Sequence, residues 1–306
     1  MTESSQGQWL CSAAMVLVGS TVVASKVIGQ DVEPFLATAL RHAAALPVFL
    51  LLMVGTGARF ERVGWRDAAL LTLQAAAGSV GYTVLLIQGV TWSSAADAGI
   101  VAGTLPAVSA LFAAVFLGER PGLRLAFAIA LATAGVMAVA AAPAGPAHAP
   151  TRLLGIVMVL AAIGCEAVFI LANKRLSRPL PPLALSTLMC AGGLVLSALP
   201  AALAMRSSPS VLSVPALAGI VYYAWVPTVG GFLLWYAGSA RTSGARASLA
   251  TAWLPVSALL LSAAVLAEPV RLWQWVGLGC VLAAVWLASR DGTPAPAAAL
   301  NETAAR

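Results

Sequence analysis

The stretch LPAVSALFAAVFLGER, residues 105–120, decides the fold because it returns in similar form as LPVSALLLSAAVLAE, residues 254–268. The leading prolines and the closing glutamates of the two copies are each separated by 149 residues, and the same offset relates Lys26 to Arg175. An internal duplication in a strongly apolar chain is typical of transporters, whose two halves move about a site between them. The repeat therefore favours a membrane carrier.

The composition excludes a water-soluble protein. Hydrophobic residues make up 60% of the chain and charged residues 9%, and the mean hydropathy is +0.93, whereas a soluble domain carries about 25% charged residues. The net charge of +6 comes from basic residues scattered over short loops, so we expect the lipid bilayer and a small-molecule substrate as partners, and no nucleic acid. The four cysteines lie in apolar stretches without the spacing of a metal site, which predicts no metal or cofactor.

The hydrophobic pattern predicts an all-α integral membrane protein of about ten transmembrane helices. Each apolar segment has about 20 residues, enough for a helix to cross about 30 Å of hydrocarbon. The predicted spans are 9–28, 34–55, 68–89, 95–117, 123–142, 153–172, 183–205, 215–239, 243–266 and 272–289.

The offset divides these spans into two repeats of five. We expect a first repeat over residues 1–142, a Pro/Gly/Ala-rich linker over 143–152, a second repeat over 153–290 and a disordered tail over 291–306. Because five is odd, the second repeat begins on the opposite side of the membrane. The pattern therefore predicts a 5+5 inverted repeat with its site near the midplane.

The distribution of basic residues predicts the orientation. With the N-terminus in the cytoplasm, 12 of the 17 Lys and Arg residues fall on the inner side, four on the outer side, and Arg41 within the second span. This bias favours both termini in the cytoplasm, and we expect a bacterial cytoplasmic (inner) membrane. Nothing in these residues indicates an oligomeric state.

The chain resembles the EamA-type family of the drug/metabolite transporter (DMT) superfamily. The two proline-led segments that end in glutamate are similar to the fourth and ninth helices of that family, and GSTVVASK, residues 19–26, is similar to its first-helix pattern. The resemblance covers nearly the whole chain. It implies efflux of amino acids, metabolites or drugs.

Two places within the apolar spans carry charge that needs a reason. Glu166 has apolar neighbours on both sides in the sixth span, and an acid at membrane depth is a functional-site hypothesis by default. Because desolvation favours the neutral carboxyl group, Glu166 is a candidate for binding a proton or a cationic group. Arg41, which is followed by His42, could hold a substrate carboxylate, pair with Glu166, or extend to the outer headgroups. A protonated or salt-bridged structural role for Glu166 remains the alternative.

Other residues are candidates for movement, packing or the pocket wall. Pro106 and Pro255 interrupt helical hydrogen bonding at equivalent positions and are candidate hinges, and Gly99 and Gly103 are expected to allow close helix packing. Tyr and Trp away from span ends need a polar partner, so the pocket candidates are Tyr82, Trp235, Tyr236 and Trp253.

Several charged residues are predicted to act as anchors at the ends of spans. Glu119 and Glu268 are expected to hold the turn that follows each of them. Asp97 and Arg246 are separated by the repeat offset, but inversion predicts that they lie near opposite faces of the membrane. They are therefore not expected to pair with each other.

The function best supported by these residues is a secondary transporter that exports a small metabolite or amino-acid-like solute by alternating access, with proton coupling as an option. The alternatives are an importer of a small organic solute and a non-transporting scaffold or regulatory membrane protein. A membrane enzyme is not expected, because the chain has no HExxH motif, paired membrane aspartates or nucleophile elbow.

Overall fold

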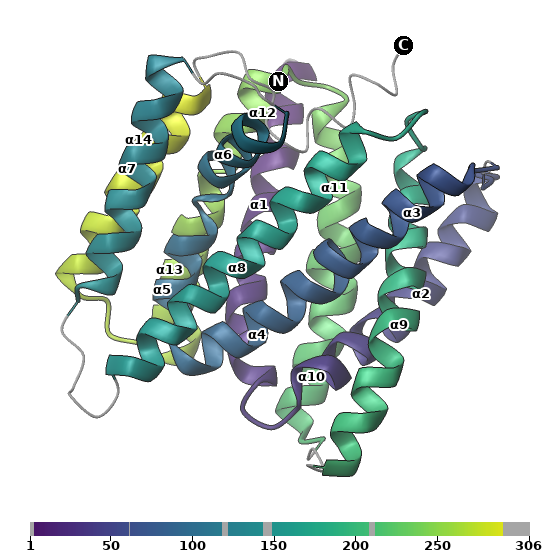
Figure 1. The fold of residues 1–306 in the computed structure, drawn as a ribbon, viewed down its shortest axis with the longest axis horizontal. Helices are drawn as coiled ribbons and strands as arrows, with labels where there is room; N and C mark the ends of the chain where they lie inside the picture. Colours follow the sequence, from purple (N-terminus) through teal and green to yellow (C-terminus); the bar gives the residue numbers. More distant parts are fainter. Residues whose placement is uncertain (1–2, 61, 118–121, 143–148, 208–211, 290–306) are drawn as a thin grey trace.

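The computed structural model describes residues 3–60, 62–117, 122–142, 149–207 and 212–289, and within these residues the secondary structure is entirely helical (Figure 1). The elements are α1 (Glu3–Ile28), α2 (Pro34–Thr56), α3 (Trp65–Gln74), η1 (Ala75–Gly81), α4 (Tyr82–Trp92), α5 (Ala95–Ala102), α6 (Leu105–Leu117), α7 (Leu123–Ala140), α8 (Ala149–Lys174), α9 (Pro182–Ser207), α10 (Val214–Tyr223), η2 (Ala224–Gly230), α11 (Gly231–Ser239), α12 (Gly244–Ala250), α13 (Trp253–Leu266) and α14 (Leu272–Ser289).

The described helices correspond to the predicted spans, although ten is an approximate number. Eight helical segments are long and apolar enough to cross a membrane, and the bent pair α5 and α6 makes a ninth. The ninth predicted span, 243–266, is divided into α12 and the shorter α13, which is not counted among these nine. Helix α8 begins at Ala149, so the last residues of the predicted linker are helical, whereas the predicted tail lies outside the described residues.

Helix α2 shows how local sequence sets an element. The Glu33 side chain accepts a hydrogen bond from Leu36 N at 2.9 Å, and Pro34 follows at the first helical position, where its missing N–H costs nothing. The helix ends at Gly57, whose φ of 69° suits a residue without a β-carbon. These two ends fix the position of Arg41 within the bundle.

Two spans change from α- to π-helical geometry at their centres, in η1 and η2. Both segments have seven residues, and they are separated by the repeat offset of 149 residues. The segment η2 contains Pro227, which has no N–H to donate, and η1 contains Gly78, which lies against Phe169. Short π-helical turns are frequently found at functional sites.

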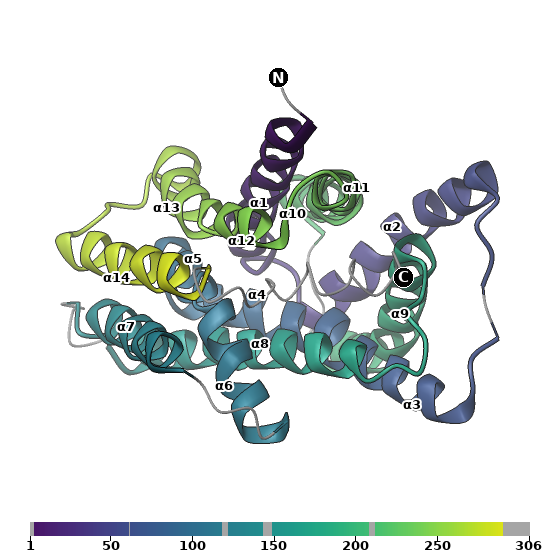
Figure 2. The same ribbon diagram turned by 90° about the horizontal axis from the view of Figure 1, so that it is seen from above.

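The helix packing follows the same offset. Helix α4 packs on α8 as α11 packs on α1, and α6 packs on α8 as α13 packs on α1. Helices α2 and α9, which are equivalent, pack on each other, as do α7 and α14. Figure 2 shows α7 and α14 at one end of the bundle and α2 and α9 at the other. Each main helix contact therefore has an equivalent contact when every helix is replaced by its counterpart in the other repeat.

The proline-led segments are separate helices and not the kinked continuous spans that the sequence predicted. The axis bends by 46° between α5 and α6, where Gly103 and Thr104 separate the two helices. Pro106 and Pro255 consequently lie in the first turns of α6 and α13, where proline is tolerated.

The glycines of α5 lie at a close helix contact. A β-carbon on Gly99 would meet the Ala258 β-carbon at 2.3 Å, and one on Gly103 would meet Pro255 Cγ at 2.8 Å. Helix α13 ends at Ala267, the one non-glycine residue of the described chain with positive φ, at 53°.

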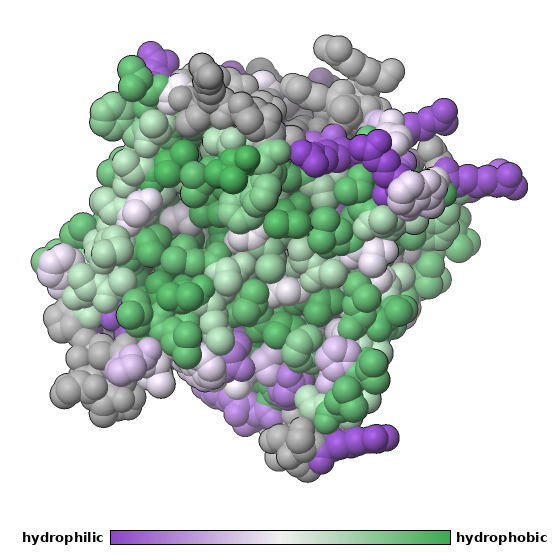
Figure 3. All heavy atoms as spheres, in the orientation of Figure 1, coloured by the Kyte–Doolittle hydropathy of each residue, from purple (hydrophilic) through white to green (hydrophobic). Residues whose placement is uncertain are grey.

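The molecular surface suits a lipid environment. Large apolar side chains are exposed along the helices, for example Leu51 at 72%, Val115 at 67% and Val195 at 72%. Figure 3 shows hydrophobic residues over the middle of one face, with hydrophilic residues gathered towards its upper and lower edges. An apolar belt between two polar ends is the surface that a bilayer covers.

Candidate substrate-binding cavity

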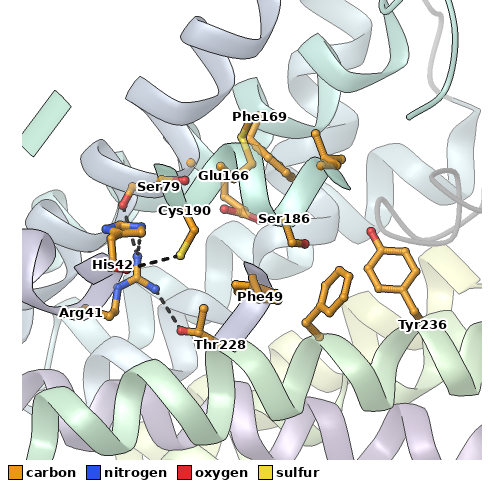
Figure 4. Close-up of a pocket in the computed structure, with 14 residues that line it drawn as sticks. Arg41, His42, Phe49, Ser79, Glu166, Phe169, Ser186, Cys190, Thr228 and Tyr236 are labelled. Carbon is orange, nitrogen blue, oxygen red and sulfur yellow. Dashed lines mark hydrogen bonds between the residues drawn. The ribbon is translucent and has the colours of Figure 1, made fainter. Parts of the chain in front are cut away.

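Two adjoining cavities lie at the centre of the bundle. The first, here called the aromatic cavity, has a volume of about 250 Å³ and includes Phe49, Phe169, Phe232 and Tyr236 in its wall (Figure 4). The second, the central cavity, has a volume of about 230 Å³ and includes Tyr82 and Tyr223. Four residues line both cavities: Arg41, Gly78, Glu166 and Thr228.

Glu166 lies in the C-terminal half of α8 and belongs to the wall of both cavities. Phe169, one turn later on the same helix face, also lines the aromatic cavity. Within the described part of the chain, the Glu166 carboxylate accepts no hydrogen bond and forms no ion pair. An acid surrounded by helices and without a partner is poised to take a proton or a cationic group.

Arg41 is fixed by contacts from several helices. One terminal nitrogen, Nη1, donates to Thr228 Oγ1 at 3.2 Å, and Nη2 donates to Thr83 Oγ1 at 2.8 Å and to Ser79 O at 3.3 Å. The guanidinium also lies 4.7 Å from the centre of the Tyr223 ring. Because its side chain is 9% exposed and turned into the bundle, the alternative in which it extends to the headgroups is wrong.

The contacts of Arg41 tie the two π-helical segments together. Ser79 lies in η1 and Thr228 in η2, and the two positions are separated by the repeat offset. Arg41 therefore connects equivalent points of the two equivalent segments. The structure contains no ion pair between Arg41 and Glu166, although both line the same cavities.

His42 supports Arg41 and is itself fully engaged. Its Nδ1 lies 2.8 Å from Thr38 O, a carbonyl that can only accept, so Nδ1 carries the proton. Its Nε2 then accepts from Arg41 Nη2 at 3.0 Å. This arrangement is that of a neutral imidazole, and the ring packs closely on Gly193.

The predicted aromatic residues separate into two groups. Tyr82 lines the central cavity and Tyr236 lines the aromatic cavity. Trp235 instead packs in a buried cluster with Cys11 and Ala14, since successive helical residues point about 100° apart. Trp253 is 47% exposed and lines neither cavity, so its prediction as a pocket residue is wrong.

Sequence reasoning missed several residues of the site. Thr83 and Thr228 hold Arg41 through their hydroxyl oxygens and Ser79 holds it through its backbone carbonyl, and Ser186 lines the aromatic cavity. Phe49, Phe169 and Phe232 form much of its wall. The offset between Ser79 and Thr228 was the one available signal, because single hydroxyls and phenylalanines are common in apolar helices.

A second polar cluster, here called the sealed end, joins the helix ends around the start of α5. Asp97 is 1% exposed, forms an ion pair with Arg152 Nε at 2.9 Å and accepts from Gln274 Nε2 at 2.8 Å. Glu268 accepts from the backbone nitrogens of Ala95 and Ala96 at 3.0 Å each. Glu268 thus caps α5 and does not merely hold the turn after its own helix; Glu119 lies outside the described residues.

Lys26 completes the sealed end. Its ammonium group donates to the carbonyl oxygens of Val90 at 2.8 Å and Ser93 at 2.7 Å, where α4 ends. Unpaired carbonyls at a helix C-terminus favour a nearby cation.

The equivalent positions at the opposite end carry exchanged charges. Arg246 stands where the other repeat has Asp97, and Glu3 stands where the other has Arg152. Arg246 is exposed and donates to Ser4 Oγ at 2.5 Å. As predicted, Asp97 and Arg246 do not pair with each other.

Comparison with known proteins supplies a family. The model of the EamA-like transporter family matches residues 5–141 and 153–290. A Bacillus subtilis (strain 168) protein named uncharacterized transporter YetK is 33% identical over 279 residues, covering 90% of this chain and 84% of that protein. A probable terminal-alkyne amino-acid exporter of Streptantibioticus cattleyicolor is 30% identical over 287 residues, or 94% of each chain.

A solved structure supports the fold alone. It matches with a TM-score of 0.63 at 22% sequence identity, and the match covers 93% of this chain and 96% of the other.

Proposed function

Because the chain belongs to the EamA-like transporter family, we propose that it is a secondary carrier that exports a small metabolite or amino-acid-like solute by alternating access. Its relatives are named as transporters, and one of them as a probable amino-acid exporter. The carrier is an integral membrane protein, for which we propose the bacterial cytoplasmic membrane.

The proposed mechanism moves two inverted repeats, residues 1–142 and 153–290, against each other. Three observations support this division: the family model matches in two stretches, the π-helical segments lie one offset apart, and the helix contacts exchange in pairs. The cavities lie where elements of both repeats meet, since α2 and η1 face α8, α9 and η2 there.

The observation that carries the function is the unpartnered carboxylate of Glu166 in the wall of both cavities. In the proposed cycle, Glu166 binds either a proton or a cationic group of the solute. Since one carboxylate cannot satisfy both at once, loading of one releases the other, and the proton gradient then drives the solute outward. Arg41 keeps a positive charge beside this exchange and holds η1 and η2 in place.

The proposed orientation places both termini in the cytoplasm, supported by the excess of basic residues on that side. In this orientation the aromatic cavity lies on the cytoplasmic side of Glu166, since Phe169 and Tyr236 lie nearer the cytoplasmic ends of α8 and α11. Reporter fusions at the C-terminus test this: a fluorescent protein should fold and fluoresce, and an alkaline phosphatase should be inactive. The opposite pattern would reverse the proposed topology.

The decisive experiment compares extracellular metabolites of hosts that express the intact protein, Glu166→Gln or Glu166→Asp at matched membrane levels. The glutamine variant keeps the size of the side chain and removes its charge, whereas the aspartate variant keeps the charge and is the matched control. We expect a compound to accumulate outside with the intact protein, less with Glu166→Asp, and at background level with Glu166→Gln.

Each other outcome has a definite meaning. Equal efflux by the intact protein and Glu166→Gln would remove Glu166 from the mechanism. Accumulation inside the cell would indicate an importer. No change in any compound would favour the scaffold.

A further inference from the structure

We propose that the solute of this site is an organic monocation: an amine with an aromatic or aliphatic body and no free carboxylate group. The inference rests on the proposed function and narrows its substrate class. Three features of the two cavities carry it, namely the free acid, the engaged arginine and the aromatic wall.

The Glu166 carboxylate is free to accept hydrogen bonds from an ammonium group. Glu166 is the one carboxylate among the described residues that line either cavity. A carboxylate can accept several hydrogen bonds and an ammonium group donates three, yet Glu166 receives none from the described chain. Figure 4 shows Glu166 and Ser186 both projecting into the aromatic cavity, so a hydroxyl oxygen is available there as well.

Arg41 does not offer the matching clamp for a carboxylate group. A planar guanidinium binds carboxylate best through two adjacent donors. The Nη2 group already faces three acceptors, Ser79 O, Thr83 Oγ1 and His42 Nε2, and Nη1 donates to Thr228 Oγ1. The Nε donor has no partner, but each bidentate pair includes Nη2, which is occupied. Arg41 is thus a positioning residue between η1 and η2.

The wall of the aromatic cavity suits the rest of a cationic solute. Phe49 meets Phe232 edge to face with ring centres 5.5 Å apart, and Phe232 lies 4.5 Å from Tyr236. Phe169 lines the same cavity. Aromatic faces attract a cation and also bury an apolar body.

The charge of the loaded site supports the same class. With a proton on Glu166, the site carries the single positive charge of Arg41. A monocation paired with ionised Glu166 leaves the same net charge, so proton and solute are electrostatic equivalents in an exchange. A zwitterion would leave the site one charge lower and would bring a carboxylate close to Arg41, whose Nη2 donor is already engaged.

A matched series of ligands tests the inference on the full-length protein in lipid nanodiscs, with binding measured by isothermal titration calorimetry. The series is 2-phenylethylamine, phenylalanine, which adds the carboxylate, and 3-phenylpropionate, which lacks the amine. We expect the amine to bind at least about tenfold more tightly than phenylalanine. The propionate should not bind.

Two variants locate the binding. Glu166→Gln should weaken amine binding by at least about tenfold, and Phe232→Leu, which keeps an apolar side chain without the ring, should weaken it about three- to tenfold. Leu199→Ala, at an exposed position 67% accessible on α9, is the control and should leave binding unchanged.

The outcomes separate this inference from the proposed function. If phenylalanine binds as tightly as the amine or more tightly, and does so through Glu166, the substrate class is overturned while the carrier proposal stands. If none of the three ligands binds in a manner that depends on Glu166, the substrate class is also overturned. The carrier proposal then depends on the metabolite comparison alone.

Discussion

The two ends of the bundle occupy equivalent positions in the duplicated chain but are held differently. At the sealed end, Asp97 is buried with Arg152 and Gln274, and Glu268 and Lys26 each bind the backbone of another helix. At the opposite end, Arg246 binds one serine hydroxyl at the surface. The equivalent positions therefore carry different chemistry, and among the described residues Asp97 has buried polar contacts where its equivalent, Arg246, has an exposed one.

The first prediction concerns the buried ion pair. Asp97→Ala should lower the free energy of unfolding by about 3 kcal/mol, because it leaves Arg152 without its acid in a largely buried setting. The equivalent change, Arg246→Ala, should cost less than about 1 kcal/mol, since its contact is exposed. Denaturant unfolding in detergent measures both. Equal losses would show that the two ends are energetically alike.

The close contact between α5 and α13 should give the next largest effect. Gly99→Ala places a β-carbon 2.3 Å from that of Ala258, so the helices must separate, and we expect a loss of about 1–3 kcal/mol. Gly279→Ala, where nothing lies within 4 Å, is the control and should be neutral or slightly stabilising. Thermal unfolding monitored by circular dichroism compares the two. A tolerated Gly99→Ala would mean that the contact between α5 and α13 adjusts easily.

Capping of α5 by Glu268 should contribute a smaller amount. Glu268→Ala removes the acceptor of two backbone N–H groups and should cost about 1–2 kcal/mol, whereas Glu268→Gln keeps one acceptor oxygen and should cost about half as much. Hydrogen exchange at Ala95 and Ala96 reports the loss directly. Unchanged protection in Glu268→Ala would contradict the cap.

The smallest difference is expected between Lys26 and Arg175, which are equivalent residues. Lys26→Met removes the donors to Val90 and Ser93 and should cost about 1 kcal/mol, while Arg175→Met removes one exposed contact and should cost about 0.5 kcal/mol or less. Modification of a cysteine introduced at Thr91 should become faster in Lys26→Met, since the end of α4 loosens. An unaltered modification rate would contradict the role of Lys26 in holding the end of α4.

The fold was largely predictable because bilayer thickness imposes one length on every span and the repeat offset supplies the architecture. Glu166 and Arg41 were identifiable because a charged residue within an apolar span is conspicuous in the sequence. The rest of the site depends on which face of a helix a residue occupies. Trp235 and Tyr236 differ by one position, and only the second reaches a cavity.

Partners far apart in the chain were the least predictable. Glu268 binds backbone N–H groups at Ala95 and Ala96, and a backbone donor has no signature in the sequence. The split of the proline-led spans was equally hidden, because proline suits the first turn of a new helix as well as a kink.

The end of α13 has a consequence for the history of the two copies. Ala267 adopts a left-handed backbone conformation that disfavours any residue with a β-carbon, and the other repeat has glycine at the equivalent position, Gly118. The second copy thus tolerates backbone strain of about 1 kcal/mol, at the residue before Glu268, whose carboxylate reaches α5. The substitution Ala267→Gly would relieve that strain while leaving the cap intact. The residue that the first repeat carries at this position would therefore stabilise the second repeat.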